Sequence, residues 1–320
     1  MTDQLLDDCV GGGHNITHTV DVECYAFFSA DAEPVMAPLG EIQNAQGVAA
    51  QCASGTYGDF RGAAGIVGAV DFRTDVREYG IDGVESMLLA CKAASPNYRG
   101  VRQSCAYDEH LTTQMLFSPP PDHPAYSLRI KPGLYLGPEF RQGFALLAKH
   151  DLSFDAWLFS SQLPELLDLA KAFPDTTIIL NHLGSPVAML GDWAGAPAYD
   201  GKQKEIEAKW KEDMARIAAE CPNVNVKVGG HGMPNAGSGF DAGDKPPGSE
   251  EVAAAFQESY MWTVETFGPS RCMFESNFPV DKVSMSYTVL WNALKRMTAG
   301  LPDEDRALLF SGTAKRVYRL

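Results

Sequence analysis

Polar side chains occupy the positions at which the apolar, strand-like segments of this sequence end. Residues 271–281 begin as a short buried strand and then place Glu275, Asn277 and Asp281 in a loop that contains a proline. Six earlier segments end in the same way, and their inward tip residues are Glu23, Asp71, Arg102, Asp155 with Trp157, His182 and Lys227. Together these residues offer the acids, bases and cations that hydrolytic chemistry requires.

The residue types suit the opening of a cyclic ester by water. That reaction needs a group that polarises the carbonyl oxygen, a base for the water and a cation for any carboxylate on the substrate. His182 is the candidate for the first role, and Glu275 or Asp281 for the second. Arg102 or Lys227 would supply the cation.

Strand-like and helix-like segments alternate along the chain. Apolar runs predict strands at residues 16–24, 62–72, 98–105, 152–159, 176–183, 224–229 and 271–275. Helical periodicity predicts helices at residues 2–10, 41–53, 81–94, 138–150, 163–173, 202–221, 250–267, 287–298 and 303–318. Two long loops, residues 106–136 and 231–248, interrupt this alternation and would line a pocket.

This alternation predicts parallel strands joined by crossover helices. Seven strands are one short of the eight that close a (β/α)8 TIM barrel, and the missing first strand would precede Thr2. The competing fold is an open doubly wound sheet, but no GxGxxG turn follows any strand. We therefore expect one TIM-barrel domain over residues 1–320, with its site at the carboxyl ends of the strands.

The same polar residues also fit a purely structural interpretation. Buried polar groups must find partners, so ion pairs of Lys227 with Asp71 or Glu275 would explain these three residues without any reaction. Single residues therefore do not separate the two interpretations. The set as a whole favours a site, because barrel interiors are otherwise filled with branched aliphatic side chains.

Composition excludes several kinds of partner. Asp and Glu number 41 against 26 Lys and Arg, a formal charge of −15, so neither nucleic acid nor an anionic membrane is expected. No apolar run approaches the roughly 18 residues of a membrane span. The seven cysteines show no CxxC spacing, which indicates reduced thiols in a cytoplasmic protein. The expected partner is a small carboxylate or lactone substrate, and a homo-oligomer is compatible with the sequence.

Several segments carry a resemblance to a known family. They are YRGVRQ, LSFDAWLFSSQLPELLDLAKAFPDTTIILNHLGSP, RCMFESNFPVDK and the C-terminal FSGTAKRVYRL. With them the chain resembles the amidohydrolase-related TIM-barrel hydrolases, in particular the predicted metal-dependent hydrolases that include 2-pyrone-4,6-dicarboxylate lactonase and sugar lactonases. The resemblance implies a hydrolase that opens a carboxylated or polyhydroxy lactone. It also implies that His182 polarises the substrate carbonyl or binds a metal, and that Arg102 holds a substrate carboxylate.

Two features depart from the family pattern. Asn277 stands where relatives often carry the aspartate that activates water, and an amide can only hydrogen-bond to water or substrate. No His-x-His precedes the first helix, and His14 and His18 are expected in a loop and on a strand surface. The sequence is therefore compatible with a bound zinc or manganese ion, with His182 as one ligand, and equally with no metal.

Two other functions stay open beside the lactone hydrolase. One is a metal-dependent decarboxylase of an aromatic or unsaturated acid, because the family also contains lyases. The other is a non-catalytic barrel that lacks its first strand and binds a small acid or buries its open edge against a partner. For the hydrolase, the expected catalytic residues are His182, Asn277, Glu275 and Asp281, and the expected substrate-binding residues are Arg102, Lys227, Trp157, Asp155 and Glu23.

Overall fold

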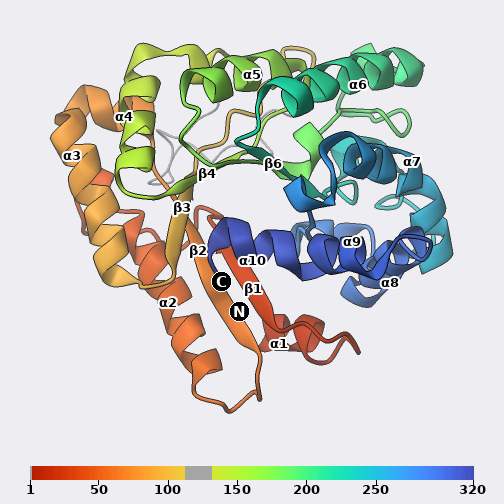
Figure 1. Ribbon diagram of the computed structural model, residues 1–320, viewed down its shortest axis with the longest axis horizontal. Coiled ribbons are helices and arrows are strands. Elements are labelled where there is room, and N and C mark those ends of the chain that lie inside the picture. The colour runs from red at the N-terminus through yellow and green to blue at the C-terminus, as the bar shows by residue number, and fades with distance from the viewer. Residues whose placement is uncertain (1, 112–131) are drawn as a thin grey trace.

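A computed structural model describes residues 2–111 and 132–320 of the chain (Figure 1). Within these ranges a single parallel sheet contains seven strands in sequence order: β1 (His18–Val22), β2 (Arg61–Ala69), β3 (Tyr98–Arg102), β4 (Ser153–Ala156), β5 (Ile178–Leu180), β6 (Val224–Val228) and β7 (Cys272–Phe274). The sheet curves as in a TIM barrel, with one strand fewer than the eight of a closed ring. The fold predicted from the sequence is confirmed.

Strand register brings the predicted tip residues together on the inner face of the sheet. Arg102 of β3 pairs with Asp155 of β4, and Asp155 pairs in turn with Ile179 of β5. The other neighbour of Ile179 is Asn225 of β6, two residues before Lys227. Directly paired residues and residues two apart in a strand point to the same face. Arg102, Asp155 and Lys227 therefore share one interior.

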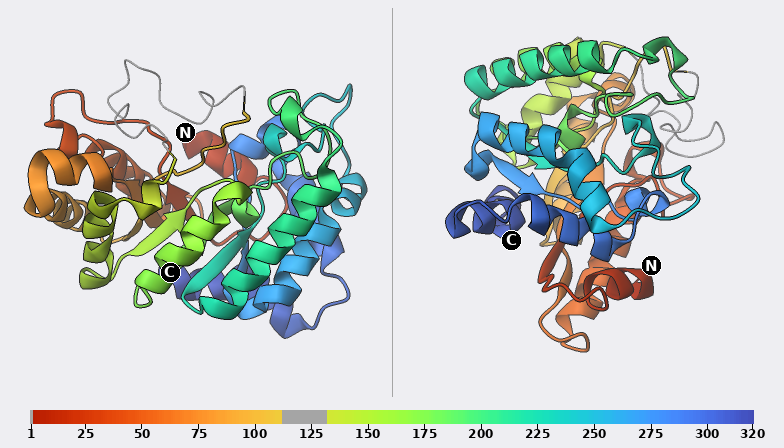
Figure 2. Two further views of the ribbon diagram at one scale, coloured as in Figure 1. Left: turned by 90° about the horizontal axis from the view of Figure 1, so that it is seen from above. Right: turned by 90° about the vertical axis from the view of Figure 1, so that its right-hand side faces the viewer.

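The connecting helices form the outer layer. The α-helices of the described residues are α1 (Thr2–Cys9), α2 (Leu39–Ala53), α3 (Phe72–Ala94), α4 (Pro138–Lys149), α5 (Leu163–Ala172), α6 (Gln203–Glu220), α7 (Ser249–Phe267), α8 (Tyr287–Met297), α9 (Asp303–Ala307) and α10 (Thr313–Tyr318), of which α10 is not part of this layer. Figure 2 shows α5, α6 and α7, coloured from green to blue, lying side by side along the strands. This two-layer arrangement buries the apolar outer face of the sheet.

Two helices differ from the sequence prediction. Helix α3 begins at Phe72 rather than at residue 81, because the Asp71 carboxylate caps its first turn by accepting the backbone N–H of Thr74 at 3.1 Å. Gly80, with φ of 69°, marks a kink near the predicted start. The helix predicted at 303–318 is interrupted by a π-helical turn over Leu308–Gly312, which separates α9 from α10.

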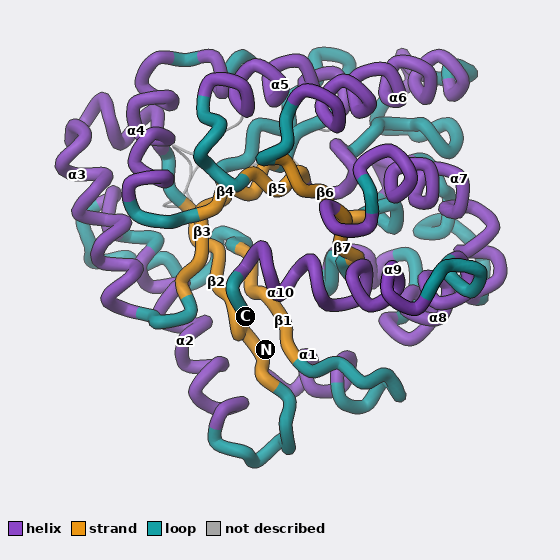
Figure 3. Tube along the Cα trace, in the orientation of Figure 1, coloured by secondary structure: helices purple, strands orange, loops and turns teal. Residues whose placement is uncertain are grey.

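Helix α10 lies where the ring is open, between β7 and β1 (Figure 3). Its residues Val317 and Tyr318 are buried in one cluster with Val67 of β2, Ile179 of β5 and Met273 of β7. Since these three strands lie around different parts of the ring, the cluster fills the interior rather than the outer layer. A helix in this place also shields the edge strands of the sheet.

Three further predictions concern the cysteines, the first long loop and membrane-spanning segments. All seven cysteines are free, and all except Cys24 are buried. Of the predicted loop at 106–136, residues 112–131 lie outside the described residues. Among the helices that the structure describes, none has both the length and the apolar character to cross a membrane.

Candidate active site

His182 and Glu275 form a buried pair at the carboxyl ends of β5 and β7. Nδ1 of His182 lies 2.6 Å from Oε1 of Glu275, and the same oxygen accepts the backbone N–H of His182 at 3.2 Å. His182 is only 4% exposed. One carboxylate oxygen thus holds both the ring and the backbone of this histidine, which fixes the orientation of the imidazole.

The charge of Glu275 decides which imidazole nitrogen carries the proton. Burial acts to raise the pKa of Glu275, but the charge and hydrogen bond of His182 and the charge of Lys227 outweigh it, so the pKa lies below its usual value. An ionised carboxylate only accepts hydrogen bonds, so Nδ1 of His182 must be the donor. In the neutral imidazole the lone pair is then on Nε2, where it can accept a proton.

The backbone around His182 adopts a conformation that residues with a Cβ rarely take. The φ angles are 54° at His182, 57° at Leu183 and 42° at Ser185. Each such residue costs of order 1–3 kcal/mol and persists only where the surroundings hold it in place. Here the indole N–H of Trp210 donates to the Leu183 carbonyl at 2.7 Å. Because such strain often clusters at functional sites, this turn is a candidate site.

Two glycines after β6 leave room for the histidine–carboxylate pair. A Cβ on Gly229 would lie 2.3 Å from Cγ of Glu275, and a Cβ on Gly230 would lie 2.6 Å from Cβ of His182. Gly230 also has φ of 80°, which only glycine adopts freely. A larger residue at either position would push the pair apart.

Arg102 is engaged in a buried ion pair with Glu23. Its Nε lies 2.6 Å from Oε1 of Glu23, and its Nη2 donates to the Glu23 carbonyl oxygen at 2.6 Å. Burial raises the pKa of Glu23 to about 7, although the charge of Arg102 acts in the opposite direction. The guanidinium carbon also lies 5.6 Å from the ring centroid of Trp157. The charge of Arg102 is therefore balanced inside the protein by Glu23 and the Trp157 ring.

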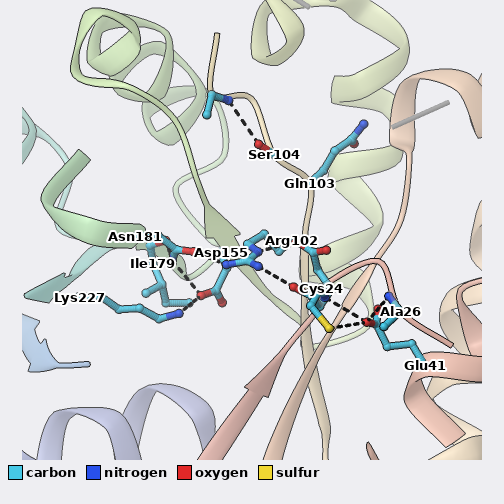
Figure 4. A network of polar contacts seen from close by, with 12 residues as sticks. Cys24, Ala26, Glu41, Arg102, Gln103, Ser104, Asp155, Ile179, Asn181 and Lys227 are labelled. Carbon is cyan, nitrogen blue, oxygen red and sulfur yellow. Dashed lines mark hydrogen bonds and ion pairs between the residues drawn. The ribbon is translucent and has the colours of Figure 1, made fainter. Parts of the chain in front are cut away.

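Asp155 is the centre of a second buried network (Figure 4). Its Oδ1 lies 2.6 Å from Nζ of Lys227 and accepts Nδ2 of Asn181 at 2.9 Å. Asn181 also accepts Nη1 of Arg102 at 3.3 Å, so the two ion pairs are connected. Asp155 is fully buried, and Lys227 is 6% exposed. Asn181, which connects the two ion pairs, directly precedes His182 in the chain.

The partner of Lys227 differs from the sequence prediction. The structural interpretation of the sequence paired Lys227 with Asp71 or Glu275, and the structure shows Asp155 instead. Oδ1 of Asp71 instead caps α3 and accepts Nε2 of Gln103 at 2.8 Å. The carboxylate of Glu275 is held by His182, and Lys227 acts on it only through its charge.

Asn277 and Asp281 form a third polar group in the loop after β7. Nδ2 of Asn277 donates to Oδ1 of Asp281 at 2.6 Å, and the backbone N–H of Gly232 donates to Oδ2 at 3.2 Å. Burial raises the pKa of Asp281 well above its usual value, more than the bond from Asn277 lowers it. Asn277 has φ of 51°, so its backbone is left-handed, like that of His182. Both side chains are thus occupied by each other.

The structure brings most of the predicted residues into connected groups. The ring centroids of Trp157 and His182 are 6.2 Å apart, so the indole joins the Arg102 pair to the histidine pair. The charge of Glu275 acts on Asp281. Asp71 stands apart as a helix cap. The groups are Arg102–Glu23 with Trp157, Asp155–Lys227 with Asn181, His182–Glu275, and Asn277–Asp281.

Sequence reasoning missed several residues of this region. Asn181 stands beside His182 in the NHLG motif, so its position was a usable signal. His231 is buried, with Nε2 at 3.0 Å from Oγ of Ser259, and burial together with the charge of His182 lowers its pKa to about 3. Tyr318 gave no signal, because a tyrosine near a helix end resembles any core residue.

Two cavities lie over the loops that follow β3, β4 and β5. They have volumes of about 230 and 370 Å³ and share Asp108, Ser161 and Tyr199 in their walls. Asp108 accepts hydrogen bonds from the hydroxyls of Tyr199 at 2.7 Å and Ser161 at 3.1 Å. Neither cavity is lined by His182. None of the paired polar residues in the four groups above lines either cavity.

The described side chains do not make up a metal centre. In residues 2–111 and 132–320, no three His, Cys, Asp or Glu side chains come together in a metal-binding arrangement. Nδ1 of His182 is engaged by Glu275, which leaves one nitrogen of that ring for any ligand. A catalytic zinc normally has three protein ligands. The donors that the structure describes therefore do not complete a catalytic zinc site.

The curved parallel sheet with polar groups at its strand ends defines a TIM-barrel protein. The Amidohydrolase family model matches residues 28–320, so the chain belongs to that family. The uncharacterized protein y4mH of Sinorhizobium fredii is 35% identical over 285 residues, 88% of this chain and 76% of that protein. An L-fucono-1,5-lactonase of Burkholderia multivorans is 28% identical over 57% of this chain. That match spans 56% of the lactonase.

Solved structures show the same fold at low sequence identity. A zinc-bound amidohydrolase from Burkholderia multivorans has a TM-score of 0.57 and 22% identity, covering 80% of this chain and 74% of that chain. A probable 2-pyrone-4,6-dicarboxylic acid hydrolase from Acinetobacter baumannii, with citric acid bound, has a TM-score of 0.60 and 12% identity. It covers 100% of this chain and 89% of that one. The predicted family is confirmed.

Proposed function

We propose that this chain hydrolyses a hydroxyl-bearing lactone with His182 as the general base, in place of the carbonyl-polarising role that the sequence suggested for it. The observation that carries the proposal is the 2.6 Å contact between His182 and Glu275 at the strained end of β5. Membership of the Amidohydrolase family and the lactonase name of one relative support the reaction class.

The histidine–carboxylate pair can perform both proton transfers of the reaction. Glu275 holds the Nδ1 proton, so Nε2 of His182 accepts a proton from water as the water oxygen attacks the lactone carbonyl carbon. The tetrahedral intermediate then breaks the ring C–O bond. The leaving oxygen takes the proton from Nε2, and the product is a hydroxy acid. Asn277, held by Asp281, takes no part as a base.

The charges of the network favour a neutral, hydroxyl-rich substrate over a carboxylated one. Arg102 and Lys227 are each paired with a buried carboxylate at 2.6 Å. In contrast, Oε2 of Glu23 and Oδ2 of Asp155 have no hydrogen-bond partner in the described part of the chain. A substrate carboxylate would therefore find neither cation free, whereas a ligand that enters the buried network could donate its hydroxyl groups to these oxygens.

A panel of substrates tests this function. Purified protein is given sugar 1,4- and 1,5-lactones and a carboxylated pyrone lactone, and acid release is followed by titration above the spontaneous rate. Each assay is repeated with added zinc, manganese or a chelator, because a relative was crystallised with zinc. We expect turnover of sugar lactones and weaker turnover of the carboxylated compound. Release of carbon dioxide from aromatic acids, dependent on metal, would favour the decarboxylase instead.

Variants connect any activity to the proposed base. We expect His182→Gln to lower kcat by about 10²–10⁴-fold, the usual contribution of a general base. His14→Gln is the matched control, since His14 contacts the Thr288 carbonyl and Lys295 far from the site and should keep full activity. Equal kcat values for wild type and His182→Gln would refute the role of His182.

A further inference from the structure

Tyr318 reaches from the C-terminal helix into the polar network of the barrel. Its hydroxyl donates to Oδ1 of Asp155 at 2.9 Å, and its ring centroid lies 5.8 Å from Nζ of Lys227. The side chain is 1% exposed. Tyr318 therefore contacts both partners of the Asp155–Lys227 ion pair, although it belongs to a helix and not to a strand of the sheet.

A single oxygen of Asp155 collects donors from three elements. Oδ1 accepts Tyr318 of α10, Lys227 of β6 and Asn181 after β5, whereas Oδ2 has no partner in the described residues. A carboxylate with one fully engaged oxygen keeps one orientation. With fewer donors on Oδ1, rotation of the carboxylate would be opposed less strongly, and its two other neighbours would be held less firmly.

This orientation is transmitted to the catalytic pair along two short routes. Asn181 precedes His182, so its side-chain anchor fixes the start of the strained turn. Lys227 acts through its charge on Glu275, which holds the imidazole. Both routes begin at Asp155 and end at the His182–Glu275 contact.

We propose that Tyr318 is a positioning residue whose hydroxyl, by holding Asp155, keeps Asn181 and Lys227 in the arrangement that orients His182 and Glu275. The C-terminal helix is then part of the active-site support and not only a filler of the ring. The kinetic consequence rests on the proposed lactone hydrolysis, whereas the structural consequence does not.

Tyr318→Phe is the first test, because it keeps the buried ring and removes only the hydroxyl. We expect kcat on the best lactone to fall about 10-fold with KM changed less than about 2-fold, since Tyr318 supports a transition-state arrangement and does not contact substrate. Arg319→Gln is the control. Arg319 donates to the Arg99 and Asp151 carbonyls, away from Asp155, so its loss should lower the melting temperature and leave kcat unchanged.

A ligand-free measurement separates this inference from the proposed function. In ¹⁵N-histidine-labelled protein, the imidazole signals of His182 are assigned by their loss in His182→Gln. We expect them to move in Tyr318→Phe and to stay in place in Arg319→Gln. Unmoved signals in Tyr318→Phe would overturn the positioning role even if lactones are hydrolysed. Moved signals would support it even if no lactone is a substrate.

Discussion

The buried cations of this barrel are paired with carboxylates of the protein, so they are not free to bind a substrate. Arg102 makes two contacts of 2.6 Å to Glu23, one to the side chain and one to the carbonyl. Removing one member of such a pair leaves the other as an unpaired buried charge. This lowers stability more than replacing both members by apolar side chains does. The Arg102–Glu23 contact is therefore a stability determinant at the scale of single residues.

We expect Arg102→Met to lower the free energy of unfolding by roughly 3–5 kcal/mol, because Glu23 is left buried and unpaired. The double variant Arg102→Met with Glu23→Gln should regain more than half of this loss. Urea denaturation of the two variants measures the difference. If Arg102 instead served mainly to bind a substrate carboxylate, the single variant would keep its stability and raise KM for the carboxylated lactone.

Gly230 is the second residue on which the site depends. We expect Gly230→Ala to lower kcat at least about 10-fold, because the new methyl group meets the His182 side chain at 2.6 Å in a backbone with φ of 80°. Gly13→Ala is the matched control: φ is 76° there, with no atom within 4 Å of the added Cβ. That variant should lose about 1 kcal/mol of stability and keep its kcat. Equal activity of both alanine variants would contradict the close approach.

Strands and helices were predictable because their patterns are local. The continuously apolar run around β5 (Ile178–Leu180) follows from burial on both faces of the sheet, and the tip residue His182 followed from its end. The ion-pair partners of the tip residues were not predictable, since a residue such as Lys227 has several carboxylates within reach. The choice of Asp155 depends on strand register and on what else each carboxylate binds.

The start of α3 shows the same limit at the scale of one element. The apolar period suggested a helix start at residue 81, nine residues after the observed start that Asp71 caps. The difference arises because Gly80 separates two helical stretches. The early start places Asp75 in the first turn, where it is 9% exposed and close to the charges of Asp71 and Glu78.

Asp75 makes the stability of the fold depend on pH. Burial, followed by the charge of Asp71, raises its pKa to about 8 from 3.8, so between these values the folded state keeps a proton that the unfolded state has released. The free energy of unfolding therefore falls as pH rises from about 4 to about 8. Asp75→Asn cannot ionise, and we expect it to be more stable than wild type at pH 8 by roughly 2–4 kcal/mol relative to their difference at pH 4.

Thermal or urea unfolding over this pH range measures the effect of Asp75. Asp82→Asn provides the control, because Asp82 is exposed on the same helix. It should follow the wild-type curve at every pH. A wild-type slope in Asp75→Asn would show that another group carries the dependence.

At the scale of the whole molecule, the sequence predicted a ring of strands with polar tips at one end. What it did not predict is how the opening between β7 and β1 is filled. The segment at 303–318 has the pattern of an ordinary outer helix, and only the turn at Leu308–Gly312 directs α10 inward. Such a turn depends on tertiary packing, for instance of Phe310 on Phe274 at 5.0 Å, and leaves no local signature.

If α10 is part of the barrel interior, its apolar residues should count as core. Val317 is 4% exposed and packs with Val67, Ile179 and Met273, so Val317→Ala should lower the free energy of unfolding by about 2 kcal/mol through lost burial and the cavity left behind. Val283, which is 59% exposed, provides the same substitution at the surface, where less than about 0.5 kcal/mol should be lost. Urea denaturation with matched slopes compares the two. Equal midpoints would mean that α10 rests on the barrel without filling it.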